Sequence, residues 1–464
     1  MARRVDLLVC VSFVAAACSS HAPGPTTVAK PAYVDPDGPH RAAIAAQVAP
    51  FVDDEVVSGL VIATYDAGKR EIYGFGKGPG HVAPNGRTLF EIGPVTSVYT
   101  ALMFADAVQR REVTIDKPVS ELLPPGVTAP TFNKHAITLG QLAVHASGLP
   151  PIPPSIATHL DKPDRFGGYG EDALYQDLVH TELRFEPGSR LIESTFGSGL
   201  LGFALGRKIG GGYAQAVTKR VLTPLHTTDT FLKVPADALA RRAQGSNDDL
   251  ADAPEWTWDA LAGGGGMVTS AKDLLDLIEA ELDAAAGSKA PLRAAMRLTQ
   301  ESQLDVEGAN LALGWRIDGT GRYWRNGSTA GFHAFVGFDA KTKHGIVILS
   351  STAISIVDRL ATNLYKLLAN EAAEPPKFPA PDELVTLAGN YDLAGTKIQI
   401  VVNGKRLYLD GGGVHQRLVP MTATEFWIEE LPAIVVFERD KDSPKVARIV
   451  FAIGQQRINA PRVD

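Results

Sequence analysis

Three side chains far apart in this 464-residue sequence carry groups that acyl-transfer chemistry uses. Ser97 offers a hydroxyl that could attack a carbonyl carbon, Glu193 a carboxylate that could act as its base, and Arg325 a guanidinium that binds anions. Together they would form an esterase-like set if folding brings them to one cleft. Pro94, one helical turn before Ser97, has no hydroxyl, and its missing N–H suits the first position of a helix.

The segment around Pro94 gives these residues their context. Residues 90–102 read FEIGPVTSVYTAL. This resembles the first motif of the class C β-lactamase and penicillin-binding protein family, F-x-I-G-S-x-x-K-x-x-T-A, in which one helical turn brings the lysine amine to the serine hydroxyl. The resemblance implies that Pro94 replaces the nucleophilic serine and Ser97 the base lysine. We therefore expect a helix that starts at Pro94 and that cannot form an acyl-enzyme there.

A second motif of the same family is also altered. The family pattern is P-G-x-R followed by Tyr-x-Asn, where the tyrosine shuttles protons and the asparagine amide holds the substrate. Residues 187–202 read PGSRLIESTFGSGLLG, so the resemblance puts Glu193 in place of the tyrosine and Thr195 in place of the asparagine. A carboxylate can act as a base, but it does not repeat a phenol's proton transfer at the same pKa.

The third family motif, Lys/His-x-Gly on the strand that lines the cleft, corresponds to residues 325–327, Arg-Asn-Gly. Arg325 keeps a cation whose fork fits a carboxylate, and Gly327 leaves space for a ligand backbone. Two interpretations follow. Ser97, Glu193, Arg325 and Gly327 could form an anion-binding site. Alternatively, Arg325 is a surface arginine that pairs with Glu193 and fills an abandoned site, an interpretation that we slightly favour.

Two further segments match family landmarks that carry no catalytic group. Residues 137–150 (ITLGQLAVHASGLP) resemble I-T-I-x-x-L-L-x-H-T-S-G-L-P, and residues 262–274 (AGGGGMVTSAKDL) resemble A-G-G-x-x-S-T-A-x-D-L. The resemblance covers about residues 41–372. His145 and Ser147 could be interpreted as a catalytic pair, but we favour the interpretation that they shape a turn.

The helices and strands that must position these residues can be predicted from hydrophobic periodicity and from the turn residues between periodic segments. We predict helices at 41–52, 94–108, 172–180, 196–209, 271–282 and 355–372, and strands at 60–65, 71–74, 332–338 and 345–351. Strands at both ends and helices in the middle predict an α/β (α+β) domain of the β-lactamase/transpeptidase type. Its antiparallel sheet is flanked by helices and carries an all-helical insertion.

The C-terminal part reads as a separate β-rich domain. We assign residues 36–373 to the β-lactamase-related domain, 374–381 to a proline-rich linker and 382–464 to a small β-barrel-like domain. Residues 387–391 (LAGNY) resemble the opening of a barrel often appended to this family. Expected strands are 398–402, 406–409, 425–428, 434–438 and 446–453, with a hairpin turn at Asn403-Gly404. A structural cap is favoured over an independent ligand-binding module.

The N-terminus resembles an export signal. Arg3 and Arg4 precede an apolar run to Ala17, and residues 15–18 (AAAC) resemble a bacterial lipoprotein cleavage box; an ordinary secretory signal is the alternative. We expect a signal peptide at 1–17 and a lipidated tether at 18–35, with the lipid on Cys18. The protein would then be anchored in the cell envelope, and Ser19 favours the periplasmic side of the outer membrane in a Gram-negative cell.

Composition excludes several classes of function. The only cysteines are Cys10 and Cys18, so the mature chain has no disulfide and no cysteine ligands, and the eleven histidines form no H-E-x-x-H motif. We therefore expect neither a metal nor another cofactor. The net charge of −7 argues against nucleic acid as a partner.

Three functional hypotheses remain. The favoured one is an exported lipoprotein that is a catalytically inactive pseudoenzyme, whose cleft binds a peptidoglycan peptide or an envelope protein. The second is a serine hydrolase, similar to a β-lactamase, D-peptidase or esterase, with a site rebuilt around Ser97. Its weak point is that a short side chain stands where a long lysine reached inward. The third is an interaction lipoprotein that uses its C-terminal barrel.

Overall fold

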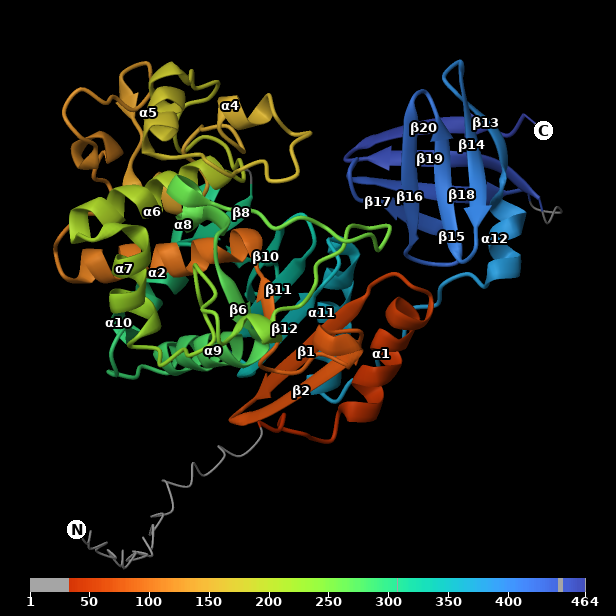
Figure 1. Ribbon diagram of the computed structural model, residues 1–464, viewed down its shortest axis with the longest axis horizontal. Helices are drawn as coiled ribbons and strands as arrows, with labels where there is room; N and C mark the ends of the chain where they lie inside the picture. Colours follow the sequence, from red (N-terminus) through yellow and green to blue (C-terminus); the bar gives the residue numbers. More distant parts are fainter. Residues whose placement is uncertain (1–32, 307, 441–444, 464) are drawn as a thin grey trace, which may run out of the picture. The chain divides into compact units, whose positions relative to one another are not determined.

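The computed structural model describes residues 33–306, 308–440 and 445–463 (Figure 1). The predicted signal peptide, Cys18 and most of the predicted tether therefore lie outside the described residues. All elements below belong to one compact unit, Asp35–Asp464. Within the described part of the chain, no helix combines the length and the apolar character needed to cross a membrane.

The centre of the first domain is an antiparallel sheet with the strand order β2-β1-β12-β11-β10-β9-β8-β7. The first and last strands of the domain meet inside this sheet, where β1 pairs with β12 and Leu60 lies opposite Ser350. The predicted sheet built from both ends of the domain is thus confirmed. Its strands are β1 (Gly59–Asp66), β2 (Lys69–Gly76), β7 (Ser302–Val306), β8 (Ala309–Ala312), β9 (Arg316–Ile317), β10 (Tyr323–Ser328), β11 (His333–Asp339) and β12 (His344–Ser350).

Helices cover both faces of this sheet (Figure 1). On one face, α1 (Arg41–Asp53) and α11 (Arg359–Leu368) share a core with Ile62 and Ile348. On the other face, α2 (Thr96–Gln109) and α9 (Ala271–Ala285) share a core with their sequence neighbours Val61 and Leu349. Neighbouring strand residues enter different cores because successive side chains of a strand point to opposite faces.

The predicted helical insertion is present between the two groups of strands. The remaining helices of the domain are α3 (Leu139–Ala143), α4 (Pro154–Ala157), α5 (Glu171–His180), α6 (Thr195–Ile209), α7 (Gly212–Val217), the π-helix η4 (Thr218–Leu222), α8 (Ala262–Gly265) and α10 (Arg293–Gln300). Short 3-10 turns are η1 (Pro79–His81), η2 (Gly93–Val95), η3 (Val119–Leu122), η5 (Leu239–Arg241), η6 (Asp259–Leu261) and η7 (Ser355–Asp358). Two small ribbons pair β3 (Leu89–Glu91) with β6 (Val268–Ser270), and β4 (Thr131–Phe132) with β5 (His135–Ala136).

Two helix predictions need correction. The helix predicted at 94–108 begins as the 3-10 turn η2, and α2 itself starts at Thr96. The helix predicted at 355–372 begins as η7, and α11 ends at Leu368. Strands β7 to β9 were not predicted, because their short segments alternate too little to be recognised. The strand that carries residues 325–327 is β10.

The C-terminal part forms a barrel-like sheet in which the eight strands pair in chain order. An isolated bridge between Tyr391 and Arg462 joins its first strand to the residue after its last, so the sheet is nearly closed. The strands follow α12 (Pro381–Leu387) and are β13 (Gly389–Leu393), β14 (Thr396–Asn403), β15 (Arg406–Gly411), β16 (Val414–Pro420), β17 (Glu425–Ile428), β18 (Ala433–Arg439), β19 (Val446–Ile453) and β20 (Gln456–Pro461). The turn at Asn403-Gly404 connects β14 to β15 as predicted.

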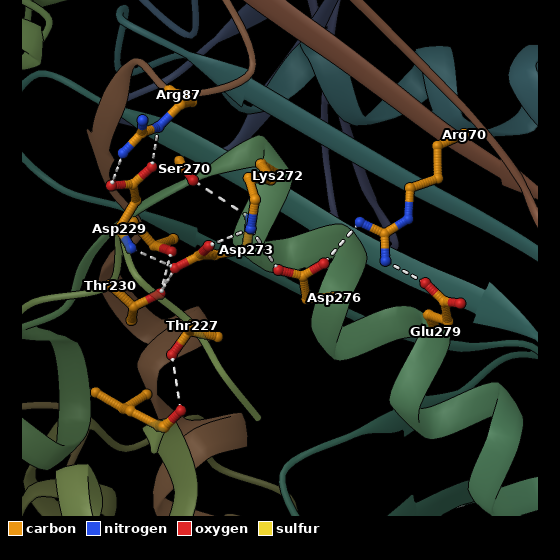
Figure 2. A network of polar contacts seen from close by, with 12 residues as sticks. Arg70, Arg87, Thr227, Asp229, Thr230, Ser270, Lys272, Asp273, Asp276 and Glu279 are labelled. Atoms are coloured by element: carbon orange, nitrogen blue, oxygen red, sulfur yellow. Dashed lines mark hydrogen bonds and ion pairs between the residues drawn. The ribbon is translucent and has the colours of Figure 1, made fainter. Parts of the chain in front are cut away.

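A network of ion pairs and hydrogen bonds connects α9 to β2 and to Arg87 (Figure 2). Arg70 of β2 bonds Asp276 at 2.6 Å, and Lys272 bonds the same carboxyl group at 2.8 Å. Farther along, the backbone N–H of Asp229 donates to the buried Asp273 at 2.7 Å, while Arg87 binds Asp229 through two bonds of 2.7 and 2.8 Å. Arg87 lies just before β3, which leads directly into η2. The network therefore anchors the chain just before β3, which leads to Pro94 in η2.

Candidate active site

Pro94 occupies the start of the helical segment, and it is packed against β10. A Cβ atom at Gly327 would lie 2.6 Å from the backbone nitrogen of Pro94 and 2.6 Å from the carbonyl oxygen of Ile92. On the other side, Gly93 has a φ of 47°, and a Cβ there would lie 2.6 Å from the carbonyl oxygen of Ser328. The two glycines thus allow η2 and β10 to approach closely, and the residue at this contact is an imino acid without a hydroxyl.

Ser97 lies in the first turn of α2 and is buried, with 3% of its surface exposed. Its Oγ has no hydrogen-bond partner among the described residues. The neighbouring hydroxyl of Thr96 is used structurally, since it accepts from the backbone N–H of Met267 at 3.1 Å. Ser97 is therefore not hydrogen-bonded to Glu193, and the predicted nucleophile and base do not form a pair.

Glu193 and Arg325 are brought together. Arg325 of β10 donates from Nη1 to Oε1 of Glu193 at 3.0 Å and from Nη2 to Oε2 at 2.6 Å, a bidentate arrangement. Arg316 of β9 donates from Nε to Oε1 of the same carboxylate at 2.9 Å. The prediction of a surface arginine is wrong in one respect: the Arg325 side chain is only 4% exposed, whereas Glu193 is 41% exposed.

His145 completes the group around Glu193. Its Nδ1 accepts from the backbone N–H of Ser194 at 3.1 Å, and its Nε2 lies 2.9 Å from Nη2 of Arg325. Burial lowers the pKa of His145 to about 4, although the Glu193 charge opposes this shift. The imidazole is therefore neutral at pH 7. His145 adopts a left-handed φ of 57°, and Ser147 accepts from the N–H of Leu149 at 3.3 Å, so both residues do take part in a turn.

The charges around Glu193 determine whether its carboxylate can act as a general base. Burial disfavours its charge, but the guanidinium charges of Arg325 and Arg316 outweigh burial and hold its pKa well below its usual range, and His145 adds to this effect only at acidic pH, where its ring is protonated. A carboxylate with so low a proton affinity is a poor general base, because proton transfer to it is strongly uphill at neutral pH. The group has one carboxylate and two guanidinium cations, so it keeps an excess positive charge.

Thr195 is the first residue of α6, and its carbonyl oxygen lies against Gly264. A Cβ atom at Gly264 would lie 2.6 Å from the carbonyl oxygen of Thr195. The preceding residue, Ser194, caps α6 by accepting from the N–H of Gly197 at 2.9 Å, and it donates to the carbonyl oxygen of Pro150 at 2.6 Å. The backbone at Thr195 is therefore held by the hydrogen bonds of Ser194 and by the close contact with Gly264.

Neither the role of Arg316 nor the contact of His145 with Arg325 was predicted from the sequence. Arg316 lies on a two-residue strand and belongs to no motif, so no spacing pointed to it. His145 stood inside a matched segment, but nothing in the sequence indicated which side chain its ring faces. In the described part of the chain, no group of three or more His, Cys, Asp or Glu residues could hold a metal ion.

The family model described as Beta-lactamase matches residues 44–371. The chain belongs to the β-lactamase family. A β-lactamase of Pseudomonas fluorescens is 26% identical over 355 residues, which cover 67% of this chain and 93% of that protein. The D-alanyl-D-alanine-carboxypeptidase/endopeptidase AmpH of Escherichia coli K12 is 28% identical over 186 residues, and this match covers 40% of this chain and 48% of AmpH.

Solved structures agree on the β-lactamase fold. A class C β-lactamase superposes with a TM-score of 0.62 at 22% identity, covering 71% of this chain and 97% of that one. A β-lactamase/D-alanine carboxypeptidase from Yersinia pestis superposes with a TM-score of 0.60, also at 22% identity, over 71% of this chain and 99% of the other. Identity at this level establishes the shared fold, while activity depends on the residues of the site.

Proposed function

We propose that this member of the β-lactamase family is a pseudoenzyme of the cell envelope that does not acylate at the family's nucleophile position. One observation carries the proposal: Pro94 offers no hydroxyl, and the nearest candidate base, Glu193, is bound by Arg316 and Arg325. Groups of a catalytic set act as a unit, so joint loss of nucleophile, lysine, tyrosine and asparagine leaves little of the family mechanism.

The same group of charges supports a binding role. Arg316 is 32% exposed and carries the positive charge that Glu193 does not neutralise. A ligand carboxylate could therefore add to Arg316 without displacing Glu193 from Arg325. Since AmpH is named a D-alanyl-D-alanine carboxypeptidase, the ligand class we propose is the C-terminal carboxylate of a peptidoglycan peptide. An envelope protein that presents an acidic chain end would use the same contact.

Penicillin labelling tests the lack of acylation. The soluble domain, residues 36–464, is incubated with a fluorescent penicillin, separated under denaturing conditions and examined for covalent fluorescence. We expect none above a heat-denatured control. Mass spectrometry of any stable adduct identifies the residue that reacted, and an adduct on Ser97 or another residue of the Pro94 site would refute the proposal.

Calorimetry tests the binding role. The probe is a peptide that ends in D-Ala-D-Ala, and the matched control is the same peptide with a C-terminal amide. We expect binding of the free acid only, and loss of that binding in Arg316→Gln. Equal affinity for acid and amide would contradict carboxylate recognition.

The proposed location depends on Cys18, the predicted lipidation site. Full-length protein in a bacterial host should incorporate labelled palmitate and fractionate with membranes. Cys18→Ala should lose the label. Label in the variant, or its absence in the parent, would contradict the lipid anchor.

A serine hydrolase with a rebuilt site is the second candidate, and the β-lactamases among the relatives favour it. Its nucleophile would be Ser97, whose buried Oγ has no partner among the described residues and which would have to reach substrate past Pro94. Ester hydrolysis that disappears in Ser97→Ala would support this candidate. Hydrolysis that persists unchanged in that variant would eliminate it.

A further inference from the structure

Three residues outside the family motifs form a hydrogen-bonded row. Ser328 is the last residue of β10, His333 is the first residue of β11 and pairs with it across the strands, and Asp358 ends η7. The Oγ of Ser328 lies 2.7 Å from Nδ1 of His333, and Nε2 of His333 lies 2.7 Å from Oδ1 of Asp358. A hydroxyl, an imidazole and a carboxylate in this order make up a nucleophile, a base and the group that orients the base.

This row lies on the face of the sheet opposite the family cleft. Arg325 and Gly327 of β10 face the cleft, since they contact Glu193 and Pro94. Successive strand residues alternate, so Ser328 faces the other side. On β11, the residue with the same orientation as His333 is Phe335, which shares a core with α1 and α11. The side chains of the row therefore lie on the face of the sheet opposite Glu193, while the backbone of Ser328 packs against Gly93, next to Pro94.

The three side chains of the row differ in their exposure to solvent, and the candidate base is the most buried of those with a measured exposure. The His333 side chain is 2% exposed and Asp358 is 23% exposed, while Ser328 is partly exposed. The second oxygen of Asp358 accepts from Nδ2 of Asn326 at 2.6 Å, which fixes the carboxylate. The base is thus shielded and held by the carboxylate, and the hydroxyl belongs to a partly exposed residue.

The charges around His333 favour its role as a base. Burial lowers the pKa of His333, but Asp358 and, more weakly, Glu429 raise it, and the net shift is upward. Glu429 lies close because its Oε2 accepts from the N–H and the hydroxyl of Ser355, both at 2.9 Å, at the start of η7. A more basic imidazole takes the proton of an attacking hydroxyl more readily.

We infer that Ser328, His333 and Asp358 form a second acyl-transfer site, which hydrolyses small esters. The Oγ of Ser328 attacks the ester carbonyl carbon while Nδ1 of His333 takes its proton. The C–O bond then breaks, and His333 returns the proton to the leaving alcohol. Water then attacks the acyl carbon and gives a proton to Nδ1 of His333. The bond between the acyl carbon and Oγ of Ser328 breaks, His333 returns the proton to Oγ, and the acid leaves. Asp358 and Asn326 are positioning residues in this scheme.

A fluorophosphonate probe tests the nucleophile directly, because such probes attach covalently to activated serines. The domain comprising residues 36–464 is labelled, digested and analysed by mass spectrometry. We expect the label on Ser328, its loss in Ser328→Ala and its retention in Ser97→Ala. Hydrolysis of p-nitrophenyl acetate should fall about 100-fold in His333→Asn, the scale of a lost general base. A circular dichroism melt of each variant verifies that it is folded.

The pH profile separates a positioning role of Asp358 from a merely structural one. The labelling rate should rise with pH as His333 loses its proton, with a midpoint above the ordinary 6.5 of histidine. Asp358→Asn removes the charge that raises this pKa, so the midpoint should move to lower pH. Failure to label Ser328 in the folded parent, or labelling that survives Ser328→Ala, would overturn the inference. A penicillin adduct in the Pro94 site would refute the pseudoenzyme proposal alone.

Discussion

Arg325 holds Glu193 with both Nη atoms, at 3.0 and 2.6 Å, although neither residue is of the type that the family motifs prescribe at these positions. The contact joins the segment before α6 to β10. An ion pair thus joins the two positions that the sequence resemblance assigns to different family motifs. A buried guanidinium needs such a partner, because an unpaired charge in this place would be costly.

The ion pair predicts a large effect of a conservative change. In Glu193→Gln, the nearly buried Arg325 keeps its charge but loses its carboxylate, which should lower the free energy of unfolding by about 2 kcal/mol. Urea denaturation at pH 7 measures this change. The control is Glu182→Gln, an exposed residue, which should leave the stability unchanged within about 0.5 kcal/mol. A Glu193→Gln variant as stable as the parent would show that the pair contributes nothing.

His145 predicts a loss of stability on mild acidification. Its pKa is about 4 in the folded protein against the ordinary 6.5, so between these values the unfolded chain binds a proton that the native state does not. Stability should therefore rise with pH across this window, by about 1.4 kcal/mol per pH unit at most. The lowered pKa of Glu193 acts separately, since its contribution is present above the ordinary 4.5 and is lost below it.

Urea denaturation at pH 4.5, 5.5 and 6.5 checks this dependence. His145→Gln lacks the titrating group and should show a flatter profile over this range. A variant with the same slope as the parent would assign the pH dependence to other groups.

Much of the fold could be predicted from the sequence because local signals agree with it. The segment from Leu60 to Tyr65 is apolar and β-branched, and the segments 137–150 and 262–274 match long patterns. Strands β7 to β9 could not be predicted in the same way, since they are short and each depends on pairing with the next strand, up to β10. The Arg325–Glu193 contact was one of two interpretations, because the chemistry of the two residues allowed it, but only the folded chain joins them.

The remainder of the site depends on contacts between elements that no periodicity encodes. Arg316, His145 and Glu193 come from β9, the turn after α3 and the segment before α6, and their convergence is a property of the packing. The row of Ser328, His333 and Asp358 was likewise not predicted. Ser328 and His333 are close in sequence, but their common face follows only once β10 and β11 are known to pair.

Gly327 predicts that the η2–β10 contact tolerates no side chain. A methyl group there would lie 2.6 Å from backbone atoms of Ile92 and Pro94, so Gly327→Ala must push the two elements apart. The free energy of unfolding should fall by about 1–3 kcal/mol, the usual cost of overpacking. Gly319→Ala is the control, because a Cβ there meets no atom within 4 Å. Equal melting temperatures of the two variants would contradict the close approach.

The buried carboxyl group of Glu281 should make the free energy of unfolding fall as pH rises, which is opposite to the dependence expected from His145. It lies on α9 with 0% of its surface exposed, and burial raises its pKa to about 8 although Gln300 donates to its Oε2 at 2.6 Å. The unfolded chain ionises this group near the ordinary 4.5, whereas the native state keeps it protonated up to about 8. Between these values the native state binds the extra proton, so stability falls as pH rises, by about 1.4 kcal/mol per unit at most.

Replacing Glu281 by glutamine should remove this loss. The amide is uncharged at every pH, and its oxygen can still accept from Gln300. Glu281→Gln should therefore gain stability relative to the parent as the pH is raised from 5 to 8, whereas Glu301→Gln, at an exposed position after α10, should follow the parent. Parallel profiles of the parent and Glu281→Gln in urea denaturation would mean that Glu281 ionises in the native state as readily as in the unfolded chain.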